Sequence, residues 1–425
     1  MPTQLEYALR KETTRQMCQV AKREFFGVDA LREGIADGKV VIPANVNHRH
    51  LVPIGIGNGL RTKVNANIGT SPVRADLKAE LRKLKVAIDA GADAVMDLSL
   101  AGDLDTIRAA IIEKSTVPVG TVPLYQALVE CGRPENLTLD AYLRVFEKHA
   151  LDGVDFATVH AGVTREAIPL LKNRLMPTVS RGGTFLVEWM KHHNRQSFLY
   201  EGFDKVLEIA KQYDVTISLG DGLRPGCIAD ATDEAQLFEL MLLGKLVERC
   251  MEKGVQAMVE GPGHIPLNDI ARNVRLAKDL CHGAPFYVLG PLATDSGAGY
   301  DHIVGAIGGA LAGMHGADFL CYLTPKEHVG LPDENDVEQG VVATRIAAHI
   351  ADIAKGRPAS KEQDRRMSEA RAKLDWSGMA RNAVDPHRFR ELAREECEGN
   401  PHAKDGCSMC GSFCTEKRKS PPAPI

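Results

Sequence analysis

The sequence VTISLGDGLRPG, residues 215–226, joins a short apolar run to a polar loop that is rich in glycine. The run at residues 215–219 suits a strand that is buried on both faces, as the strands of parallel sheets are. A helix-like stretch at residues 235–253 follows the loop. A strand, a Gly/Pro loop and an amphipathic helix in this order make one βα unit.

The same unit recurs along the chain after residue 60. The strand-like runs are residues 64–68, 94–98, 117–122, 156–159, 177–180, 215–219, 257–259, 286–289 and 319–323. They begin roughly 20–40 residues apart, which is the length of a βα unit. Helix-like stretches such as residues 78–90 lie between them, and another, residues 337–355, follows the last run. We predict an α/β fold, a parallel (βα)8 barrel of the TIM type, with a doubly wound open sheet as the alternative. Nine runs are one more than a barrel needs, so one of them lies outside the barrel.

The chain divides into three regions by the character of its sequence. Residues 1–60 form an N-terminal preface, with helical patterns at residues 12–24 and 28–36. Residues 61–355 hold the repeated units and the expected substrate site. Residues 356–425 form a charged helical arm that ends in a tail containing several cysteines.

The composition is that of an ordinary globular protein. Of the 425 residues, 44% are apolar and 25% are charged, and the net charge is −4. A chain of this charge has no expected nucleic-acid surface. No apolar run of the sequence reaches the ~20 residues of a membrane helix, so no membrane partner is expected. The first residues, MPTQLEYALRKETTRQ, are charged and lack the apolar core of a secretory leader, which predicts a cytoplasmic protein.

Three cysteines lie within eight residues near the end of the chain, in CSMCGSFC, residues 407–414. Three thiolates are too few to close a tetrahedral zinc site, but they suit an iron–sulfur cluster with one iron left open. An open iron binds a small molecule and passes it an electron, which indicates radical chemistry. Zinc with a fourth ligand such as His402 is the alternative, and a reducing compartment disfavours a disulfide. The other cysteines, at positions 18, 131, 227, 250, 281, 321 and 397, are interpreted as small buried apolar residues.

Polar residues follow most of the strand-like runs, and in a barrel they meet at one rim, where the active site lies. Asp221 and Arg224 would hold opposite parts of a polar substrate, or pair with each other. Glu260 would bind an amine-bearing group, or serve as a structural carboxylate. The run SRGG, residues 180–183, offers a guanidinium and backbone N–H groups to a phosphate, or is a plain turn.

Three histidines and a tyrosine on the same rim have two interpretations each. His264 and His328 would form a two-imidazole metal site, or act as hydrogen-bonded polar residues. His160 and Tyr125 would transfer protons or donate hydrogen bonds, or simply line the wall of a polar pocket.

The sequence resembles the phosphomethylpyrimidine synthase family, the thiamin-pyrimidine radical S-adenosylmethionine enzymes, and among them the short members. The likeness runs over about residues 3–417. The shared motifs are NANIGTS (65–71), SRGG (180–183), LGDGLRPG (219–226), EGPGH (260–264), TPKEH (324–328) and CSMCGSFC (407–414). The resemblance implies a (βα)8 barrel and a homodimer whose cluster-bearing arm reaches the partner's active site. It also implies 5-aminoimidazole ribotide as the substrate and an external electron donor.

The resemblance implies a set of functional residues as well. The ribotide pocket would be formed by Asn67, Met96, Tyr125, His160, Ser180, Arg181, Gly182, Asp221, Arg224, Glu260 and Tyr287. His264 and His328 would hold zinc. Cys407, Cys410 and Cys414 would bind a 4Fe–4S cluster whose open iron takes the amino and carboxylate groups of S-adenosylmethionine. One electron then cleaves the sulfonium, and the adenosyl radical removes a hydrogen from the ribose, which implies a radical carbon–carbon lyase.

The sequence departs from the thiamin enzymes near the expected reacting centre. They read Leu-Ser-Thr-Gly where this chain has LSLA, residues 98–101, and Asp-Ile-Ala-Pro-Gly-Tyr-Asp-His where it has DSGAGYDH, residues 295–302. Loss of the threonine hydroxyl near Met96 favours a paralogue that converts the ribotide to 5-hydroxybenzimidazole, a cobamide lower-ligand precursor in anaerobic cobalamin biosynthesis. The thiamin pyrimidine, 4-amino-5-hydroxymethyl-2-methylpyrimidine phosphate, is the alternative product. A zinc hydrolase barrel that uses His264 and His328 is a more remote alternative.

Overall fold

The computed structural model describes residues 2–399, 409 and 413–418. The chain forms two compact units, Met1–Ala351 and Asp352–Ile425. The first unit contains a barrel and the residues before it, and the second contains the helices that follow. No helix in the described part of the chain is long and apolar enough to cross a membrane.

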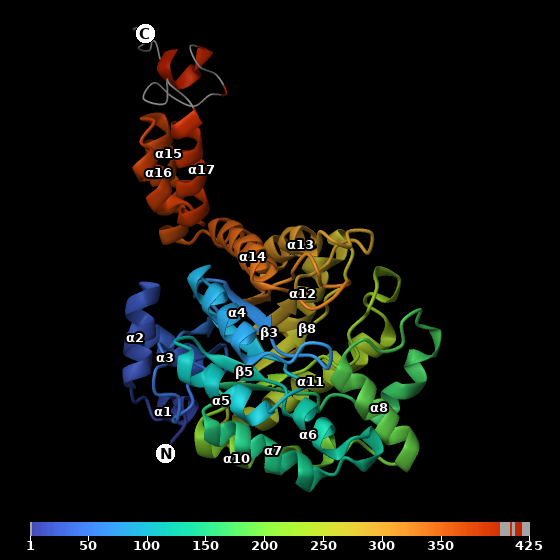
Figure 1. Cartoon of the computed structure of the whole chain (residues 1–425). Coiled ribbons are helices and arrows are strands. Elements are labelled where there is room, and N and C mark those ends of the chain that lie inside the picture. Colours follow the sequence, from blue (N-terminus) through green and yellow to red (C-terminus); the bar gives the residue numbers. More distant parts are fainter. Residues whose placement is uncertain (1, 400–408, 410–412, 419–425) are drawn as a thin grey trace. The chain divides into compact units, whose positions relative to one another are not determined.

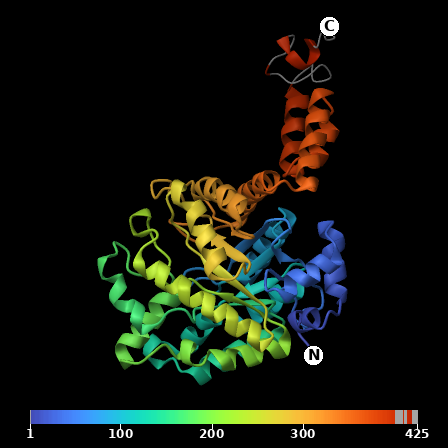
Figure 2. The same cartoon turned by 180° about the vertical axis from the view of Figure 1, so that it is seen from behind.

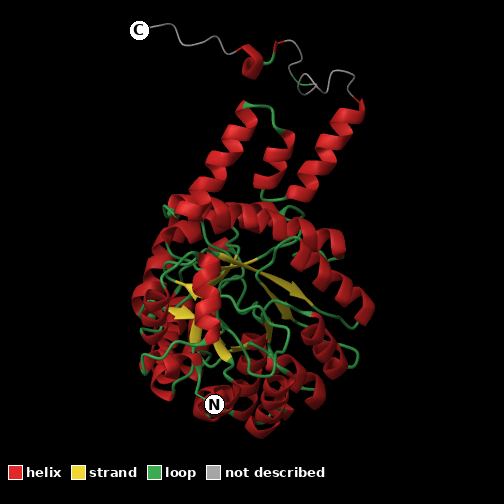
Figure 3. Cartoon of the chain, turned by 90° about the vertical axis from the view of Figure 1, so that its left-hand side faces the viewer, coloured by secondary structure: helices red, strands yellow, loops and turns green. Residues whose placement is uncertain are grey.

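Eight parallel strands close into a barrel surrounded by helices, which confirms the predicted fold class (Figure 3). In barrel order they are β10 (Phe319–Cys321), β3 (Lys63–Ile68), β4 (Ala94–Asp97), β5 (Val119–Thr121), β6 (Phe156–Val159), β7 (Thr216–Leu219), β8 (Ala257–Gly261) and β9 (Phe286–Leu289). The strand register pairs Asn67 with Met96 and Glu260 with Tyr287. These four predicted site residues therefore lie beside one another near the carboxyl ends of their strands.

The helices of the first unit cover the outside of the barrel (Figures 1 and 2). They are α4 (Leu77–Asp89), α5 (Leu104–Lys114), α6 (Pro123–Cys131), α7 (Leu139–Asp152), α8 (Arg181–His193), α9 (Phe198–Glu201), α10 (Phe203–Tyr213), α11 (Glu234–Lys253), α12 (Ile270–Leu280), α13 (Asp301–His315) and α14 (Glu334–Ala354). Several begin where a polar side chain accepts a hydrogen bond from the first-turn backbone, as Asp76, Asp103, Thr138 and Asp233 do. Short 3-10 helices are η1 (Pro134–Asn136), η2 (Arg165–Asn173), η3 (Ile228–Asp230) and η4 (Leu267–Asp269).

The predicted strand at residues 177–180 is wrong. This segment leads into α8, and Ser180 accepts a hydrogen bond from the Gly183 amide as the cap of that helix. Val179 lies against the loop after β7, because a Cβ added at Gly226 would be 2.1 Å from its Cγ1 atom. An apolar residue in contact with a neighbouring loop gives the same local pattern as a strand, which explains the ninth run.

The N-terminal preface covers the amino ends of the barrel strands. It contains α1 (Gln4–Leu9), α2 (Arg15–Glu24), α3 (Val28–Ala36) and the antiparallel pair β1 (Val40–Val41) and β2 (Ile56–Gly57). The Asn45 amide and the His48 ring both bond to Asp155, which directly precedes β6. The Ile42 amide bonds to Gln256, directly before β8. The preface thus occupies the end of the barrel opposite the predicted site.

Aromatic side chains fill the interior of the barrel. Phe319 stacks on Tyr287 with ring centroids 4.4 Å apart and meets Phe156 edge-on at 6.2 Å. A Cβ added at Gly120 on β5 would be 2.2 Å from the Phe156 ring, so glycine makes the room for that ring. The interior is a packed core, as in other barrels of this type, and it supports Tyr287 from below.

The second unit contains α15 (Pro358–Ala372), α16 (Trp376–Asn382), α17 (Pro386–Gly399) and the 3-10 turn η7 (Thr415–Arg418). α16 and α17 are separate helices: α16 ends at Asn382, and Pro386, which cannot continue a preceding helix, begins α17. Trp376 packs on Phe389 at 6.2 Å between ring centroids, which ties α16 to α17.

Candidate active site

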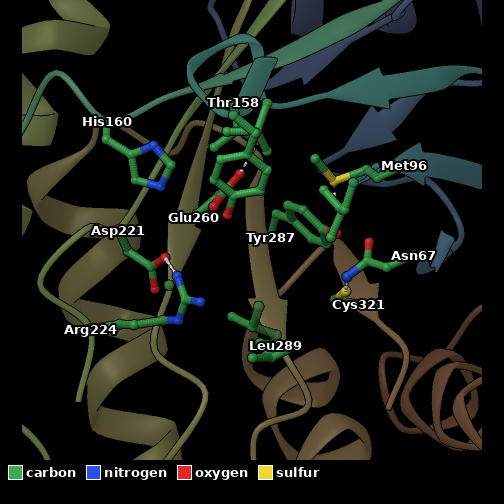
Figure 4. Close-up of a pocket in the computed structure, with 15 residues that line it drawn as sticks. Asn67, Met96, Thr158, His160, Asp221, Arg224, Glu260, Tyr287, Leu289 and Cys321 are labelled. Atoms are coloured by element: carbon green, nitrogen blue, oxygen red, sulfur yellow. Dashed lines mark hydrogen bonds and ion pairs between the residues drawn. The ribbon is translucent and has the colours of Figure 1, made fainter. Parts of the chain in front are cut away.

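A pocket lies at the carboxyl ends of the barrel strands (Figure 4). It is lined by Asn67, Met96, Leu98, Val122, Tyr125, Thr158, His160, Asp221, Arg224, Glu260, Gly261, Tyr287, Val288, Leu289 and Cys321. Eight of the eleven residues predicted to bind substrate are in this lining. The other three, residues 180–182, lie at the start of α8. They are behind His160, since a Cβ added at Gly182 would be 2.5 Å from the His160 ring.

Glu260 lies at the centre of the pocket between two hydroxyl groups. Thr158 and Ser218 each donate a hydrogen bond of 2.7 Å to its Oε1 atom. Burial raises the pKa of the Glu260 carboxyl, and the two hydroxyl groups and Arg224 oppose that shift. Since both hydrogen bonds end on Oε1, the second carboxylate oxygen is the one that can accept a hydrogen bond from a ligand.

Asp221 and Arg224 form an ion pair on the loop after β7, as one of the two sequence interpretations has it. The Arg224 Nη1 atom is 3.2 Å from Asp221 Oδ1, while the buried Oδ2 atom has no hydrogen-bond partner in the described structure. Burial raises the Asp221 pKa to about 7, with Arg224 lowering it and Glu260 raising it. The pair therefore brings both a guanidinium and a carboxyl with an unused oxygen to the pocket.

His160 is a neutral imidazole on the same side of the pocket as Asp221 and Arg224 (Figure 4). Burial, together with the nearby Arg224 charge, lowers its pKa to about 3. Its Nε2 atom is 3.2 Å from the Ser180 hydroxyl. A neutral ring at this place can orient a polar ligand by hydrogen bonding without adding charge.

Arg181 is the first residue of α8 and is directed toward the Tyr125 ring. Its guanidinium carbon is 5.8 Å from the ring centroid, within cation–π range. The N-terminal backbone N–H groups of α8 follow it directly. A helix N-terminus beside two arginines, Arg181 and Arg224, is suited to an anionic group such as a phosphate.

The opposite wall of the pocket contains sulfur and amide groups (Figure 4). The Asn67 amide donates to the Cys321 sulfur at 3.2 Å, and the Tyr287 hydroxyl is 3.5 Å from the Met96 sulfur. Asn65 donates to the Tyr287 hydroxyl at 2.7 Å and so fixes it. Burial raises the pKa of the Cys321 thiol to about 12, so the group is a neutral thiol.

Three polar residues in or directly behind the pocket wall, Cys321, Thr158 and Ser218, were not among the predicted site residues. Cys321 is buried, as expected from its apolar surroundings, but its side chain also lines the pocket. Thr158 and Ser218 hold Glu260 from within strands β6 and β7. The one feature of the sequence that could have indicated them is a hydroxyl residue inside an otherwise apolar run. Each lies on the face of its strand that is directed toward the pocket.

His264 and His328 face each other with ring centroids 5.5 Å apart. Asp295 bonds to the Nδ1 atom of His264 and Asp301 to the Nδ1 atom of His328, both at 2.8 Å. A carboxylate on Nδ1 orients an imidazole so that Nε2 is presented to a metal. Both carboxylates come from the DSGAGYDH segment, residues 295–302, at the positions that it shares with the family pattern.

The histidine pair supplies two ligands, whereas catalytic zinc usually has three from the protein. Among the described residues no group of three or more His, Cys, Asp or Glu side chains is arranged to hold a metal. The donor set therefore fits a zinc ion only if water or a ligand completes it. Burial lowers the pKa of His264, which keeps its ring in the neutral form that a metal needs.

Two of the three predicted cluster cysteines, Cys407 and Cys410, lie outside the described residues, as does His402. Cys414 is described, and it is partly exposed, whereas Cys250 and Cys281 are buried. An accessible thiol fits the expected role better than a buried one, because a thiolate must reach the iron.

A closed barrel with a polar pocket at the carboxyl ends of its strands defines a (βα)8-barrel enzyme. A model described as the Radical SAM ThiC family matches residues 3–420, and the chain belongs to that family. The family confirms the resemblance and makes the protein a radical S-adenosylmethionine enzyme. Chemistry of this class implies S-adenosylmethionine and an iron–sulfur cluster.

The chain is similar over nearly its whole length to proteins named phosphomethylpyrimidine synthase. That of Desulforamulus reducens is 54% identical over 421 residues, which cover 98% of this chain and 97% of the relative. That of Moorella thermoacetica is 56% identical over 418 residues, which cover 97% and 96%. Among solved structures, a dihydropteroate synthase of Xanthomonas albilineans aligns over 75% of this chain and 100% of that chain. Its TM-score of 0.45 and identity of 12% are too low to bear on function.

Proposed function

We propose that the protein is a phosphomethylpyrimidine synthase, which converts 5-aminoimidazole ribotide to 4-amino-5-hydroxymethyl-2-methylpyrimidine phosphate for thiamin biosynthesis. The observation that carries the proposal is the similarity at 54–56% identity, over almost the full chain, to relatives of that name. The same relatives weigh against the sequence-based preference for 5-hydroxybenzimidazole as the product.

5-Hydroxybenzimidazole is the second candidate product. The segment LSLA, which departs from the pattern of the thiamin enzymes, begins at Leu98, a residue in the pocket lining. Two residues of this segment are altered: Leu100 takes the position of the family's threonine and Ala101 that of its glycine. Within the described structure neither is in the pocket lining, and the Leu100 amide bonds to the Thr70 carbonyl. A change outside the lining supports the thiamin product more than a new reaction course.

The pocket residues suit the parts of an aminoimidazole ribotide. Arg181, Arg224 and the start of α8 are suited to the phosphate, since guanidinium groups and helix N-termini both favour anions. Glu260 and Asp221 are suited to the amine-bearing ring, which presents N–H donors. His160, neutral and bonded to Ser180, would orient the ribose hydroxyl groups.

The cluster proposed on Cys407, Cys410 and Cys414 supplies, when bound, the electron that cleaves S-adenosylmethionine into a radical. An external reductant is needed to restore that electron. The described residues of the pocket contribute binding, orientation and exclusion of water, which is the usual division of work between a protein and such a cofactor. We propose a carbon–carbon lyase on this basis, acting in the cytoplasm.

We also propose that the protein is a homodimer. α13 exposes a row of apolar side chains, with Ile303 48%, Ile307 55% and Met314 39% exposed. The three residues recur at helical spacing, so they form one stripe on the helix. An exposed apolar stripe of this kind is typical of a surface that a second chain covers.

The product is tested by mass analysis. Purified protein is reconstituted with iron and sulfide without oxygen and incubated with the ribotide, S-adenosylmethionine and a reductant. We expect the phosphorylated pyrimidine together with 5′-deoxyadenosine. A benzimidazole would overturn the thiamin assignment and favour the second candidate, and formation of neither aromatic product from an intact cluster would contradict both.

Zinc is expected to bind at His264 and His328, and metal analysis tests this. Protein from zinc-supplemented cells should carry about one zinc per chain, and His264→Ala should reduce this below about a tenth. Asp295→Asn should weaken zinc binding by about 10- to 100-fold, because it removes the acceptor that orients the ring. His282→Ala, at an exposed histidine paired with Glu248, is the control and should leave the zinc content unchanged. Full zinc occupancy in His264→Ala would refute this site.

A further inference from the structure

Glu239 is a buried carboxyl group behind the pocket and outside its lining. The residue lies on α11 and is only 2% exposed. Its Oε2 atom accepts a hydrogen bond of 2.7 Å from the Leu223 amide, in the middle of the loop between Asp221 and Arg224. The residue is thus bonded to the backbone that carries two of the predicted ligand-binding groups.

Three rim segments form this side of the pocket: the loop after β6, the loop after β7 and the start of α8. They meet at glycines above Glu239. A Cβ added at Gly183, on α8, would be 1.9 Å from the Gly222 carbonyl oxygen. Cβ atoms added at Gly162 and Gly222 would be 3.4 and 3.3 Å from the Glu239 Oε1 atom. The carboxyl of Glu239 therefore lies under the junction of the loops after β6 and β7, and the start of α8 lies against that junction.

A second, smaller cavity extends from this junction toward α12. Polar groups in its wall include Asp221, Gln236, Glu239 and Asn273. Two buried oxygens, Glu239 Oε1 and Asp221 Oδ2, have no hydrogen-bond partner in the described structure. Both belong to residues that line this cavity, so the two carboxyl groups share one enclosed polar space behind the substrate pocket.

We propose that Glu239 is a positioning residue that holds the Asp221–Arg224 loop in the geometry that binds the ribotide phosphate and ring. This inference rests on the proposed function. Ionised Glu239 would place a second negative charge beside Asp221 and so repel an anionic ligand. The neutral acid keeps the acceptor for the Leu223 amide without that charge.

The surroundings of Glu239 favour the neutral acid at neutral pH. Burial raises its pKa to about 8, and the Asp221 charge raises it as well. The amides of Leu223 and Gly222 and the charge of Arg174 act in the opposite direction. Arg224 and Glu260 act in turn on the pKa of Asp221, which Arg224 lowers and Glu260 raises.

The raised pKa has a consequence for stability that can be measured. An unfolded glutamate titrates near 4.5, so between about pH 4.5 and pH 8 the folded chain holds a proton that the unfolded chain has lost. The free energy of unfolding contributed by this group therefore falls as pH rises through that window. Glu239→Gln removes this fall. The melting temperature of the variant, relative to that of the wild type, should therefore rise from pH 5 to pH 8.

Ribotide binding to the full-length protein, followed by calorimetry, tests the proposal. At pH 7, Glu239→Gln should bind within about threefold of the wild type, because an amide also accepts from Leu223 and carries no charge. Glu239→Ala should bind at least about 30-fold more weakly, because the loop loses its support. From pH 7 to pH 9 the wild-type affinity should fall about tenfold, which Glu239→Gln should not show.

Glu252→Gln, an exposed substitution on the same helix, is the matched control and should reproduce both wild-type profiles. If Glu239→Ala does not fold, the pH profile of Glu239→Gln carries the test alone. Wild-type affinity in folded Glu239→Ala, or an alkaline fall that persists in Glu239→Gln, would overturn the inference. No ribotide binding by the wild type would instead overturn the proposed function, and with it this role for Glu239.

Discussion

Cys414→Ser is expected to abolish the cleavage of S-adenosylmethionine, with a loss of at least about a thousandfold in 5′-deoxyadenosine formation. A serine hydroxyl stays protonated at neutral pH and does not replace a thiolate as a ligand to cluster iron. The same change should remove the brown colour and the absorbance near about 400 nm that thiolate-bound iron gives. Product is measured by chromatography after anaerobic reconstitution, alongside iron and sulfide analysis.

Cys18→Ser is the matched control for this substitution, because Cys18 lies on α2 of the preface and is exposed, contrary to the sequence-based interpretation that it is buried. It should keep the full cluster content and turnover. If Cys414→Ser also kept its turnover, the three-cysteine cluster would be refuted, and the zinc alternative for the tail would become the better interpretation.

Mixing a variant with a defective tail and one with a weakened pocket, at a ribotide concentration too low for the second to turn over, tells whether the tail acts on its own barrel or on the partner's. Cys414→Ser keeps an intact pocket, and Glu260→Gln keeps an intact tail. If the proposed homodimer exchanges tails, mixed dimers of the two variants contain one complete site and regain up to about a quarter to a half of the activity. Absence of recovery in demonstrably mixed dimers would place both functions in one chain.

The barrel could be predicted because parallel strands buried on both faces leave a direct mark on the sequence. Eight of the nine apolar runs are strands, each followed by a polar loop and a helix. The ninth run, at residues 177–180, has the same composition for a different reason, since Val179 packs against the loop at Gly226. A local pattern reports that a residue is buried, but it does not report which neighbour buries it.

The site was predictable where a residue directly follows a strand. Asp221, Arg224, His160 and Glu260 were placed on one rim by topology alone, and the structure brings them around one pocket. Whether Asp221 pairs with Arg224 or binds substrate could not be decided from spacing, because both outcomes need the same two residues. The observed pair leaves one carboxyl oxygen of Asp221 without a partner, so pairing and ligand binding are compatible.

Groups that act from outside the rim could not be predicted. Thr158 and Ser218 lie within strands, where a hydroxyl residue gives no sign of its partner. Asp295 reaches His264 from a loop, and Asp301 reaches His328 from the start of α13. Glu239 reaches the rim from α11. These contacts join residues far apart in sequence, and only the closed barrel brings them together.

Glu260→Gln is expected to weaken ribotide binding by about 100-fold with little change in stability. The carbonyl oxygen of glutamine can take the place of Oε1 and keep both hydroxyl hydrogen bonds from Thr158 and Ser218. The amide nitrogen then replaces the other carboxylate oxygen, so an acceptor that faces the ligand becomes a donor. A hydrogen bond to a charged group contributes about 1.5–3 kcal/mol, and about 1.4 kcal/mol corresponds to a factor of ten in affinity.

Calorimetry with the ribotide measures the affinity, and thermal unfolding checks that the fold is retained. Glu260→Ala provides the contrast, because it leaves Thr158 and Ser218 without their acceptor and should lower the melting temperature as well as the affinity. Glu234→Gln, at an exposed position in the first turn of α11, should change neither. A folded Glu260→Gln variant that binds the ribotide as tightly as the wild type would show that Glu260 is a structural carboxylate. The amine-bearing ring would then have to be recognised by Asp221, whose second oxygen is buried and has no hydrogen-bond partner in the described structure.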